Sequence, residues 1–164
     1  MGILKRVTVN ISDMKISNDP EALLITHSLG SCIGVIAYDP KIKLAGLLHF
    51  QLPDSSNHGP RAQENPFMFA DTGIPLMLEQ LYAKGGNRNR MSFSIFGGAS
   101  MLDDEQLFKT GVKNQRASKK ILWQHSITVT CEDIGGNSSR TVGIEIDSGK
   151  ISLRKDGTQF YCNE

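Results

Sequence analysis

Apolar and polar residues alternate in short segments along this chain, and the pattern predicts a protein that mixes strands and helices. Strands are predicted where β-branched and apolar residues lie between turn-forming residues, at 1–12, 23–26, 33–38, 44–50, 91–96, 127–131, 141–146 and 151–154. The polar segment 13–21 is predicted to be a connection. The pattern therefore favours an α/β or α+β sandwich.

Two segments have a helical period and are predicted to be the two main helices. The first runs from the capping pair Asp71-Thr72 to about Lys84, before Gly85-Gly86, with apolar residues on one face: Ile74, Leu78, Leu81 and Tyr82. The second spans 112–125, and its inward face carries Ala117, Ile121 and Leu122.

The segment from residue 26 to residue 53 carries the chemistry. Its two apolar runs, 33–38 and 44–50, are separated by Asp39-Pro40, a typical turn sequence, and predict a β-hairpin. If the loop is 39–42, residues whose numbers sum to 81 lie opposite each other, which pairs Cys32 with His49. A loop that extends through Lys43 would shift this register by one or two residues. Such a shift would offset the pair, so the thiol beside the imidazole is the hypothesis for the 39–42 loop.

The connection that precedes Cys32 is predicted to shape a cleft. Thr26 ends a strand, and the residues that follow lead through Gly30 and Ser31 into Cys32. Because glycine adopts backbone angles that other residues avoid, Gly30 is expected to allow a sharp turn. The backbone N–H groups of this loop are then candidates for an oxyanion hole.

Six ordered blocks of this sequence resemble the chemoreceptor glutamine deamidase family, CheD, from about residue 10 to about residue 155. They are Thr26-x-x-Leu29-Gly30-Ser31-Cys32, Tyr38-Asp39, His49-Phe50-x-Leu52-Pro53, Ala70-Asp71-Thr72-x-Ile74-Pro75, Phe96-Gly97-Gly98-Ala99 and Glu132-Asp133-Ile134-Gly135-Gly136. The sequence departs from the family at His27 and Ser28, which replace the more usual apolar residue and glycine. The resemblance implies a three-layer α/β/β sandwich with mostly antiparallel or mixed sheets.

The resemblance also implies a reaction and three residues that catalyse it. The reaction is hydrolysis of a protein glutamine side chain to glutamate and ammonia, by a cysteine-dependent protein-glutamine glutaminase that needs no cofactor. Cys32 is expected to be the nucleophile and His49 the acid and base, with Thr26 orienting the imidazole. Pairing with a cationic imidazole is expected to lower the pKa of the Cys32 thiol toward neutrality or below.

The partners implied by the resemblance are the cytoplasmic helices of methyl-accepting chemotaxis receptors, as substrate. An alternative function is an interaction module that binds a CheC-type phosphatase and has little catalytic activity. The intact set of Thr26, Cys32 and His49 favours the enzyme.

Composition narrows the remaining function classes. A chain of 164 residues is expected to form one domain, 1–164. The net charge of +1 predicts no nucleic-acid partner, because the small basic cluster at Lys84, Arg88 and Arg90 is typical of a solvated surface. No apolar run reaches the roughly 18 residues that span a bilayer, and the first residues lack a signal-peptide pattern, so we expect a cytoplasmic protein without membrane insertion.

Other uses of the cysteines and histidines are less well supported by spacing. The three cysteines, Cys32, Cys131 and Cys162, are odd in number and have no Cys-x-x-Cys spacing, which argues against a disulfide framework or a zinc ribbon. A metal site built from Cys32 with His27, His49 and His58 would not match common zinc spacings. We therefore expect no metal.

Overall fold

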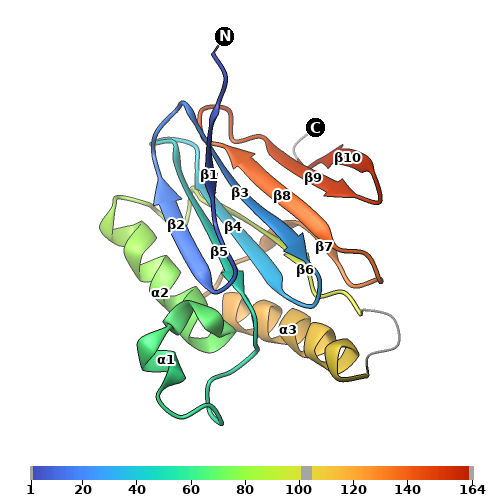
Figure 1. Cartoon of the computed structure of the whole chain (residues 1–164). Coiled ribbons are helices and arrows are strands. Elements are labelled where there is room, and N and C mark those ends of the chain that lie inside the picture. Colours follow the sequence, from blue (N-terminus) through green and yellow to red (C-terminus); the bar gives the residue numbers. More distant parts are fainter. Residues whose placement is uncertain (1, 101–104, 163–164) are drawn as a thin grey trace.

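Two five-stranded sheets and two long helices make up the computed structural model of the chain, which describes residues 2–100 and 105–162 (Figure 1). The helices are α1 (Arg61–Glu64), α2 (Ala70–Ala83) and α3 (Glu105–Gln124), and a 3₁₀ turn covers Pro66–Met68. The strands are β1 (Lys5–Thr8), β2 (Asp13–Ser17), β3 (Ala22–Leu29), β4 (Ile33–Asp39), β5 (Leu44–Phe50), β6 (Ser92–Gly97), β7 (Val129–Ile134), β8 (Arg140–Glu145), β9 (Ile151–Lys155) and β10 (Thr158–Tyr161).

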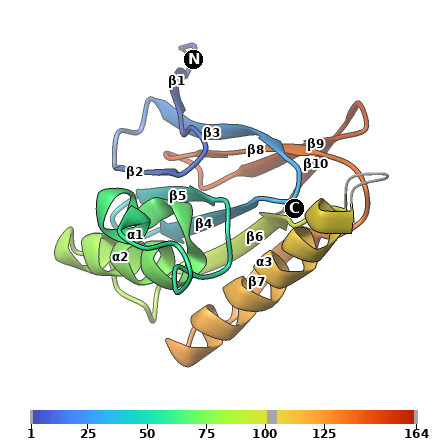
Figure 2. The same cartoon turned by 60° about the horizontal axis from the view of Figure 1, so that its bottom comes forward.

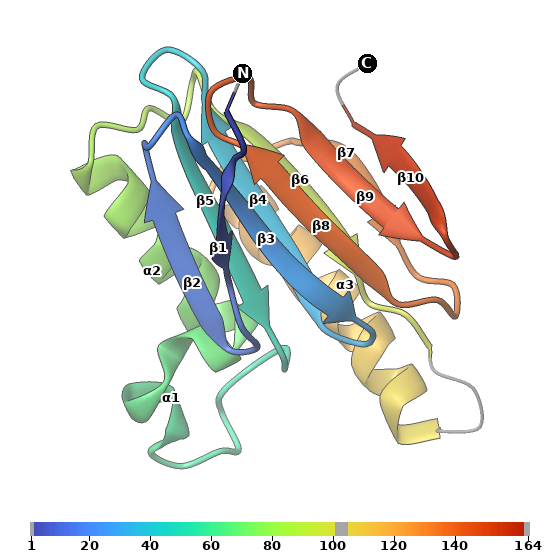
Figure 3. The ribbon, with the colours of Figure 1, turned by 45° about the horizontal axis from the view of Figure 1, so that its top comes forward.

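Each sheet is mixed. The outer sheet has the order β1-β3-β8-β9-β10, in which only β1 and β3 are parallel neighbours. The inner sheet has the order β2-β5-β4-β6-β7, in which only β6 and β7 are parallel. Figure 3 looks onto the outer sheet, with the inner sheet and the helices behind it.

The layers are helices, inner sheet and outer sheet, as Figure 2 shows from the side. One apolar core, which includes Ile74, Leu78 and Ile121, joins the helices to the inner sheet, and a second, which includes Leu24 and Ile144, fills the space between the sheets. All residues of β4 and β5 are buried because these strands are covered on both faces, which explains their unbroken apolar runs. The predicted three-layer α/β/β sandwich with mixed sheets and two main helices is confirmed.

Some predicted elements were wrong in detail. The segment 13–21 is not only a connection, because β2 begins there and pairs with β5. β10 was missed, since its four residues form an exposed edge strand without an apolar face. Asp71 and Thr72 do not cap α2 but lie inside its first turn, where the Thr72 hydroxyl donates a hydrogen bond to the Pro66 carbonyl.

A disulfide joins Cys131 of β7 to Cys162, the residue after β10. This corrects the prediction from the sequence, which argued against a disulfide framework because the cysteines are odd in number and have no Cys-x-x-Cys spacing; the two bonded cysteines lie 31 residues apart. β7 and β10 are the last strands of the inner and outer sheets, so stacking of the sheets brings the two cysteines together. Cys32 is a free cysteine.

Within the described part of the chain, no helix combines the length and the apolar character that crossing a bilayer requires.

Candidate functional site

The candidate site lies where the chain leaves β3 in the outer sheet and enters β4 in the inner sheet. The pairing of β3 with β8 gains one extra residue between Thr26 and Leu29, which is a β-bulge. Ser28 adopts the left-handed conformation there, with φ of 58°. Gly30 was expected to supply the unusual backbone angle, but it is not among the described residues with a positive φ, and the left-handed conformation falls on Ser28 instead.

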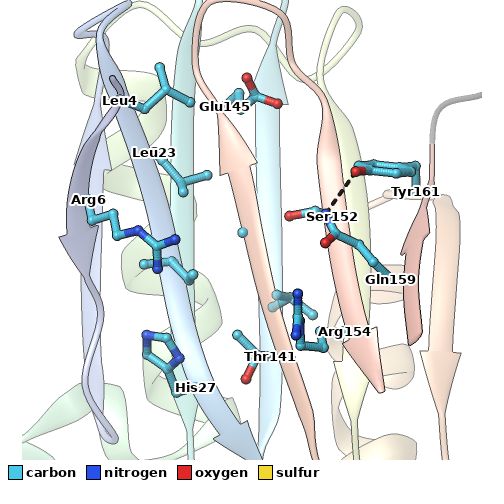
Figure 4. A pocket seen from close by; sticks show the side chains of 13 residues that line it. Leu4, Arg6, Leu23, His27, Thr141, Glu145, Ser152, Arg154, Gln159 and Tyr161 are labelled. Carbon is cyan, nitrogen blue, oxygen red and sulfur yellow. Dashed lines mark hydrogen bonds between the residues drawn. The ribbon is translucent and has the colours of Figure 1, made fainter. Parts of the chain in front are cut away.

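Thr26 and His27 point to opposite faces of the outer sheet, as neighbours on a strand must. Thr26 is fully buried between the sheets. His27 instead lines a groove on the outer face, beside Arg6 and across from Arg154 (Figure 4). His27 therefore does not share a site with Cys32 and His49.

Across residues 2–100 and 109–162, no three His, Cys, Asp or Glu side chains come together as a metal site would require.

The register of the β4–β5 hairpin differs from the predicted one. Asp39 pairs with Leu44 and Gly34 with His49, so opposing residue numbers sum to 83 and the loop is 40–43. The loop ends at Lys43, whose φ of 50° closes the turn one residue later than assumed. Cys32 is therefore not directly opposite His49 but diagonal to it, two residues before Gly34.

Cys32 and His49 still face the same layer. A Cβ on Gly34 would contact the side chains of Leu29 and Val142, which belong to the outer sheet, so position 34 faces that sheet. His49 is paired with Gly34, and Cys32 is two residues away along the strand, so both share this direction. Diagonal positions of a sheet lie about 7–8 Å apart between Cα atoms, within reach of longer side chains.

Thr26 fixes the tautomer of His49. The single hydroxyl hydrogen of Thr26 is donated to the carbonyl of Val9 at 2.6 Å. The Thr26 Oγ1 lies 2.8 Å from Nδ1 of His49, so this oxygen accepts and the imidazole carries its hydrogen on Nδ1. Nε2 is consequently the basic nitrogen, and it is buried without a hydrogen-bond partner among the residues that the structure describes.

Burial keeps the thiol and the imidazole neutral. Cys32 is 8% exposed and His49 4% exposed. Desolvation raises the pKa of the Cys32 thiol to about 11, although its own backbone N–H acts in the opposite direction. Desolvation lowers the pKa of His49 to about 4. The expectation of a thiol pKa lowered by a cationic imidazole was wrong for this resting state, because neither charge is favoured in the closed layer.

The loop before β4 is held by its carbonyl groups. The N–H of Ala99 donates to the carbonyl of Gly30, and the N–H of Gly98 donates to the carbonyl of Cys32, both at 2.8 Å. Gly97 permits this approach, because a Cβ there would lie 2.1 Å from the Cys32 carbonyl oxygen. The Phe96-Gly97-Gly98-Ala99 block thus forms a backbone cradle for the loop.

A further contact comes from Asn114 of α3, which sequence reasoning missed. Its side-chain amide donates to the carbonyls of Ser31 and Gln51, each at 2.9 Å. Its signal in the sequence was a polar residue one turn before the apolar stripe of a helix, with no indication of its partners.

The N–H groups of Ser31 and Cys32 point away from the residues that bind the loop carbonyls. In a trans peptide the N–H lies opposite the preceding carbonyl, and none of the described peptide bonds is cis. The N–H of Ser31 is therefore directed away from Ala99, and the N–H of Cys32 away from Asn114. Within the described residues, neither N–H donates to a backbone carbonyl.

The fold and the site together have the chemistry expected of a class of enzymes that use a cysteine nucleophile. A thiol, an imidazole of fixed tautomer and free backbone N–H groups at one end of an α/β/β sandwich are what attack on a carbonyl carbon requires.

Comparison with known proteins is consistent with this class. Residues 51–155 match the family model described as CheD chemotactic sensory transduction. The chain belongs to the CheD family.

Relatives cover nearly the whole chain. "Probable chemoreceptor glutamine deamidase CheD" of Solibacter usitatus (strain Ellin6076) is 45% identical over 95% of this chain and 92% of that protein. "Probable chemoreceptor glutamine deamidase CheD 1" of Syntrophus aciditrophicus (strain SB) is 45% identical over 92% of this chain and 94% of its own. The "Probable chemoreceptor glutamine deamidase CheD" of Pyrococcus horikoshii is 35% identical over 93% of this chain and 93% of that protein.

Among solved structures, the Bacillus licheniformis hypothetical protein YfiH superimposes with a TM-score of 0.47 and 16% identity. The superposition covers 73% of this chain and 49% of that chain.

Proposed function

We propose that this protein is a cysteine-dependent protein-glutamine deamidase that acts on chemoreceptors. Membership of the CheD family and the names of the relatives, which call them probable glutamine deamidases, support deamidation as the reaction. The observation that carries the assignment of residues is the hydrogen bond from His49 to Thr26, because it leaves Nε2 as an unpartnered base in the layer that Cys32 faces.

The first step is attack on the glutamine carboxamide. Thiol and imidazole start neutral, so proton transfer from Cys32 to Nε2 of His49 accompanies formation of the bond between Sγ and the carbonyl carbon. The imidazolium that forms is stabilised at Nδ1–H by Thr26, whose oxygen is held by its own bond to Val9. The carbonyl oxygen becomes an oxyanion, which the N–H groups of Ser31 and Cys32 bind.

The second step releases ammonia. The imidazolium proton moves from Nε2 to the amide nitrogen, the C–N bond breaks and a thioester on Cys32 remains. Water then attacks the thioester with His49 as base, the C–S bond breaks and the proton returns to the thiol. The balance is one carboxamide and one water giving one carboxylic acid and one ammonia.

The proposed setting follows from the family. The substrates are glutamines in the cytoplasmic helices of chemoreceptors, and the protein acts in the cytoplasm without a cofactor or metal. Binding of a CheC-type phosphatase is a compatible role for the same chain.

The test is mass spectrometry of receptor cytoplasmic fragments, which detects replacement of an amide NH₂ by OH. The wild type should convert specific glutamines and release ammonia, and Cys32→Ala should abolish both while its circular dichroism stays unchanged. The double variant Cys131→Ser/Cys162→Ser is the matched control, because it removes the two cysteines of the disulfide, keeps the Cys32 thiol and should leave turnover intact.

The turnover assay, combined with a pull-down, distinguishes the deamidase from the interaction module. Retained turnover in Cys32→Ala would rule out the mechanism. A folded wild-type protein that converts no glutamine, yet retains a CheC-type protein in a pull-down, would favour the interaction module.

A further inference from the structure

Asn114 joins the two segments that carry the thiol and the imidazole. It is completely buried, and its one amide nitrogen donates to the carbonyl of Ser31, next to Cys32, and to the carbonyl of Gln51, two residues after His49. The last pair of the β4–β5 ladder is Ile33 with Phe50. The Asn114 amide therefore bridges the segment before β4 and the segment after β5, just beyond the point where the backbone pairing of these strands ends.

The chemistry of this contact is specific to a side-chain amide. A primary amide places two N–H donors on one nitrogen, and here both are used by carbonyl groups. Aspartate has no donor, and serine has one. In the described part of the chain, the Oδ1 atom of Asn114 is buried without a hydrogen-bond partner. An unpartnered buried acceptor is unfavourable, so a residue that served only to pack the core would be better replaced by an apolar one.

The amide is also fixed relative to the glycine cradle. Gly111, one turn earlier on α3, packs so closely that a Cβ would lie 2.5 Å from the Ala99 carbonyl oxygen. Gln115 donates from its side chain to the Gly98 carbonyl at 2.8 Å. α3 is therefore positioned by the same residues, Gly98 and Ala99, that hold the carbonyls of the nucleophile loop.

The buried face of α3 changes character along its length. Over residues 109–124 of α3, the first buried residues are Gly111, Asn114 and Ser118, and further on the helix buries Ile121 and Leu122. The second part packs on the helix–sheet core, whereas the first part contacts the backbone around Cys32. Of its buried polar side chains, Asn114 donates to the segments that carry Cys32 and His49, whereas the Ser118 hydroxyl donates within α3 itself.

We propose that Asn114 is a positioning residue that holds the Cys32 loop and the His49 strand at the separation that the reaction requires. The inference rests on the proposed function for its effect on turnover. Asn114 fixes the Ser31 carbonyl, and the planar peptide then fixes the N–H of Cys32 on the opposite side. It acts through these groups and does not contact the reacting atoms.

The test compares Asn114→Ala with Ser118→Ala. Ser118 is equally buried on the same helix, but its hydroxyl donates only to the Gln115 carbonyl of α3 itself. Asn114→Ala should lower kcat by about 10- to 100-fold with KM within about threefold, because a small misplacement of reacting groups is costly. Ser118→Ala should leave both constants near the wild-type values.

A second measurement needs no substrate and therefore does not depend on the proposed function. Iodoacetamide should label Cys32 faster in Asn114→Ala than in wild type, because the loop opens, and Ser118→Ala should not change the rate. If the wild type proved to be no deamidase, this labelling comparison would decide the inference alone. Wild-type labelling and an unchanged kcat in Asn114→Ala would overturn it.

Folding of the variants is checked by circular dichroism and urea unfolding. If Asn114→Ala does not fold, Asn114→Ser, which keeps one donor near the two carbonyls, takes its place with the same expected changes. If both fail to fold while Ser118→Ala folds, Asn114 is required for folding and the positioning role is overturned.

Discussion

The two ends of β4 lie beside buried polar groups that differ in how completely they are hydrogen-bonded. At one end, the carboxylate of Asp39 has no exposed surface and accepts hydrogen bonds from both Nε and Nη2 of Arg90 and from the N–H groups of Asn87 and Lys41. At the other end, Cys32 precedes the strand beside His49, whose Nε2 has no partner. A buried group whose bonds are complete stabilises the fold, whereas a buried base with a free lone pair is available for chemistry.

The pKa shifts at the two ends have different causes. Burial raises the pKa of Asp39, but the hydrogen bonds from Arg90, Asn87 and Lys41 outweigh burial and lower it below its usual value. At the other end, burial acts on His49 without a compensating charge and lowers its pKa to about 4. The Asp39 carboxylate is therefore ionised and paired with Arg90, whereas the His49 imidazole is neutral.

The largest expected effect on stability is at Asp39. Asp39→Asn should lower the free energy of unfolding by about 2–4 kcal/mol, because the buried carboxylate is lost and its partly exposed partner Arg90 is left without the opposite charge. Urea unfolding at pH 7 measures this, and kcat/KM for deamidation should change by less than about threefold, since the residue lies at the far end of β4. A large loss of activity in a folded Asp39→Asn protein would contradict the division between the two ends.

An intermediate effect is expected from pH. His49 has a folded pKa of about 4 against an ordinary value near 6.5, so between these values the unfolded state binds more protons and stability falls as pH falls. The free energy of unfolding should be about 2 kcal/mol lower at pH 5 than at pH 7 from this group alone. Asp39 has a lowered pKa, so its contribution is lost only below its ordinary pKa of about 3.9.

The control for the pH experiment is His49→Asn, which keeps a side-chain N–H that can donate to Thr26 but removes the titrating ring. Other groups titrate equally in both proteins, so the difference between them isolates His49. Equal pH dependence of wild type and His49→Asn would show that this imidazole is not held neutral by burial.

The smallest effect is expected at Ser28. Ser28→Gly should raise the free energy of unfolding by about 0.5 kcal/mol, because glycine adopts a positive φ without a Cβ clash but loses more entropy on folding. Lys43, with φ of 50° at the other end of β4, is the matched site. Lys43→Gly should gain less, since it also removes an ion pair with Asp147. Thermal unfolding measures both, and destabilisation by Ser28→Gly would show that its side chain has another role.

The hairpin illustrates how far the sequence could predict the site. The two apolar runs and Asp39-Pro40 were enough to place Cys32 and His49 on adjoining segments that face one layer. They were not enough to set the register, because Lys41, Ile42 and Lys43 are compatible with more than one loop length. The register was decided by the pairing of both strands with their other neighbours, β2 and β6.

The sequence alone determined the elements that depend on local pattern: the buried strands, the two helices and the ordered motifs that mark the family. Tertiary structure decided what depends on distant segments, such as the disulfide between Cys131 and Cys162 and the clamp of Asn114 on Ser31 and Gln51. It also decided that Cys32 and His49 are neutral. The physical reason is that periodicity and turn chemistry act over a few residues, whereas desolvation and hydrogen bonding depend on what the folded chain places around each group.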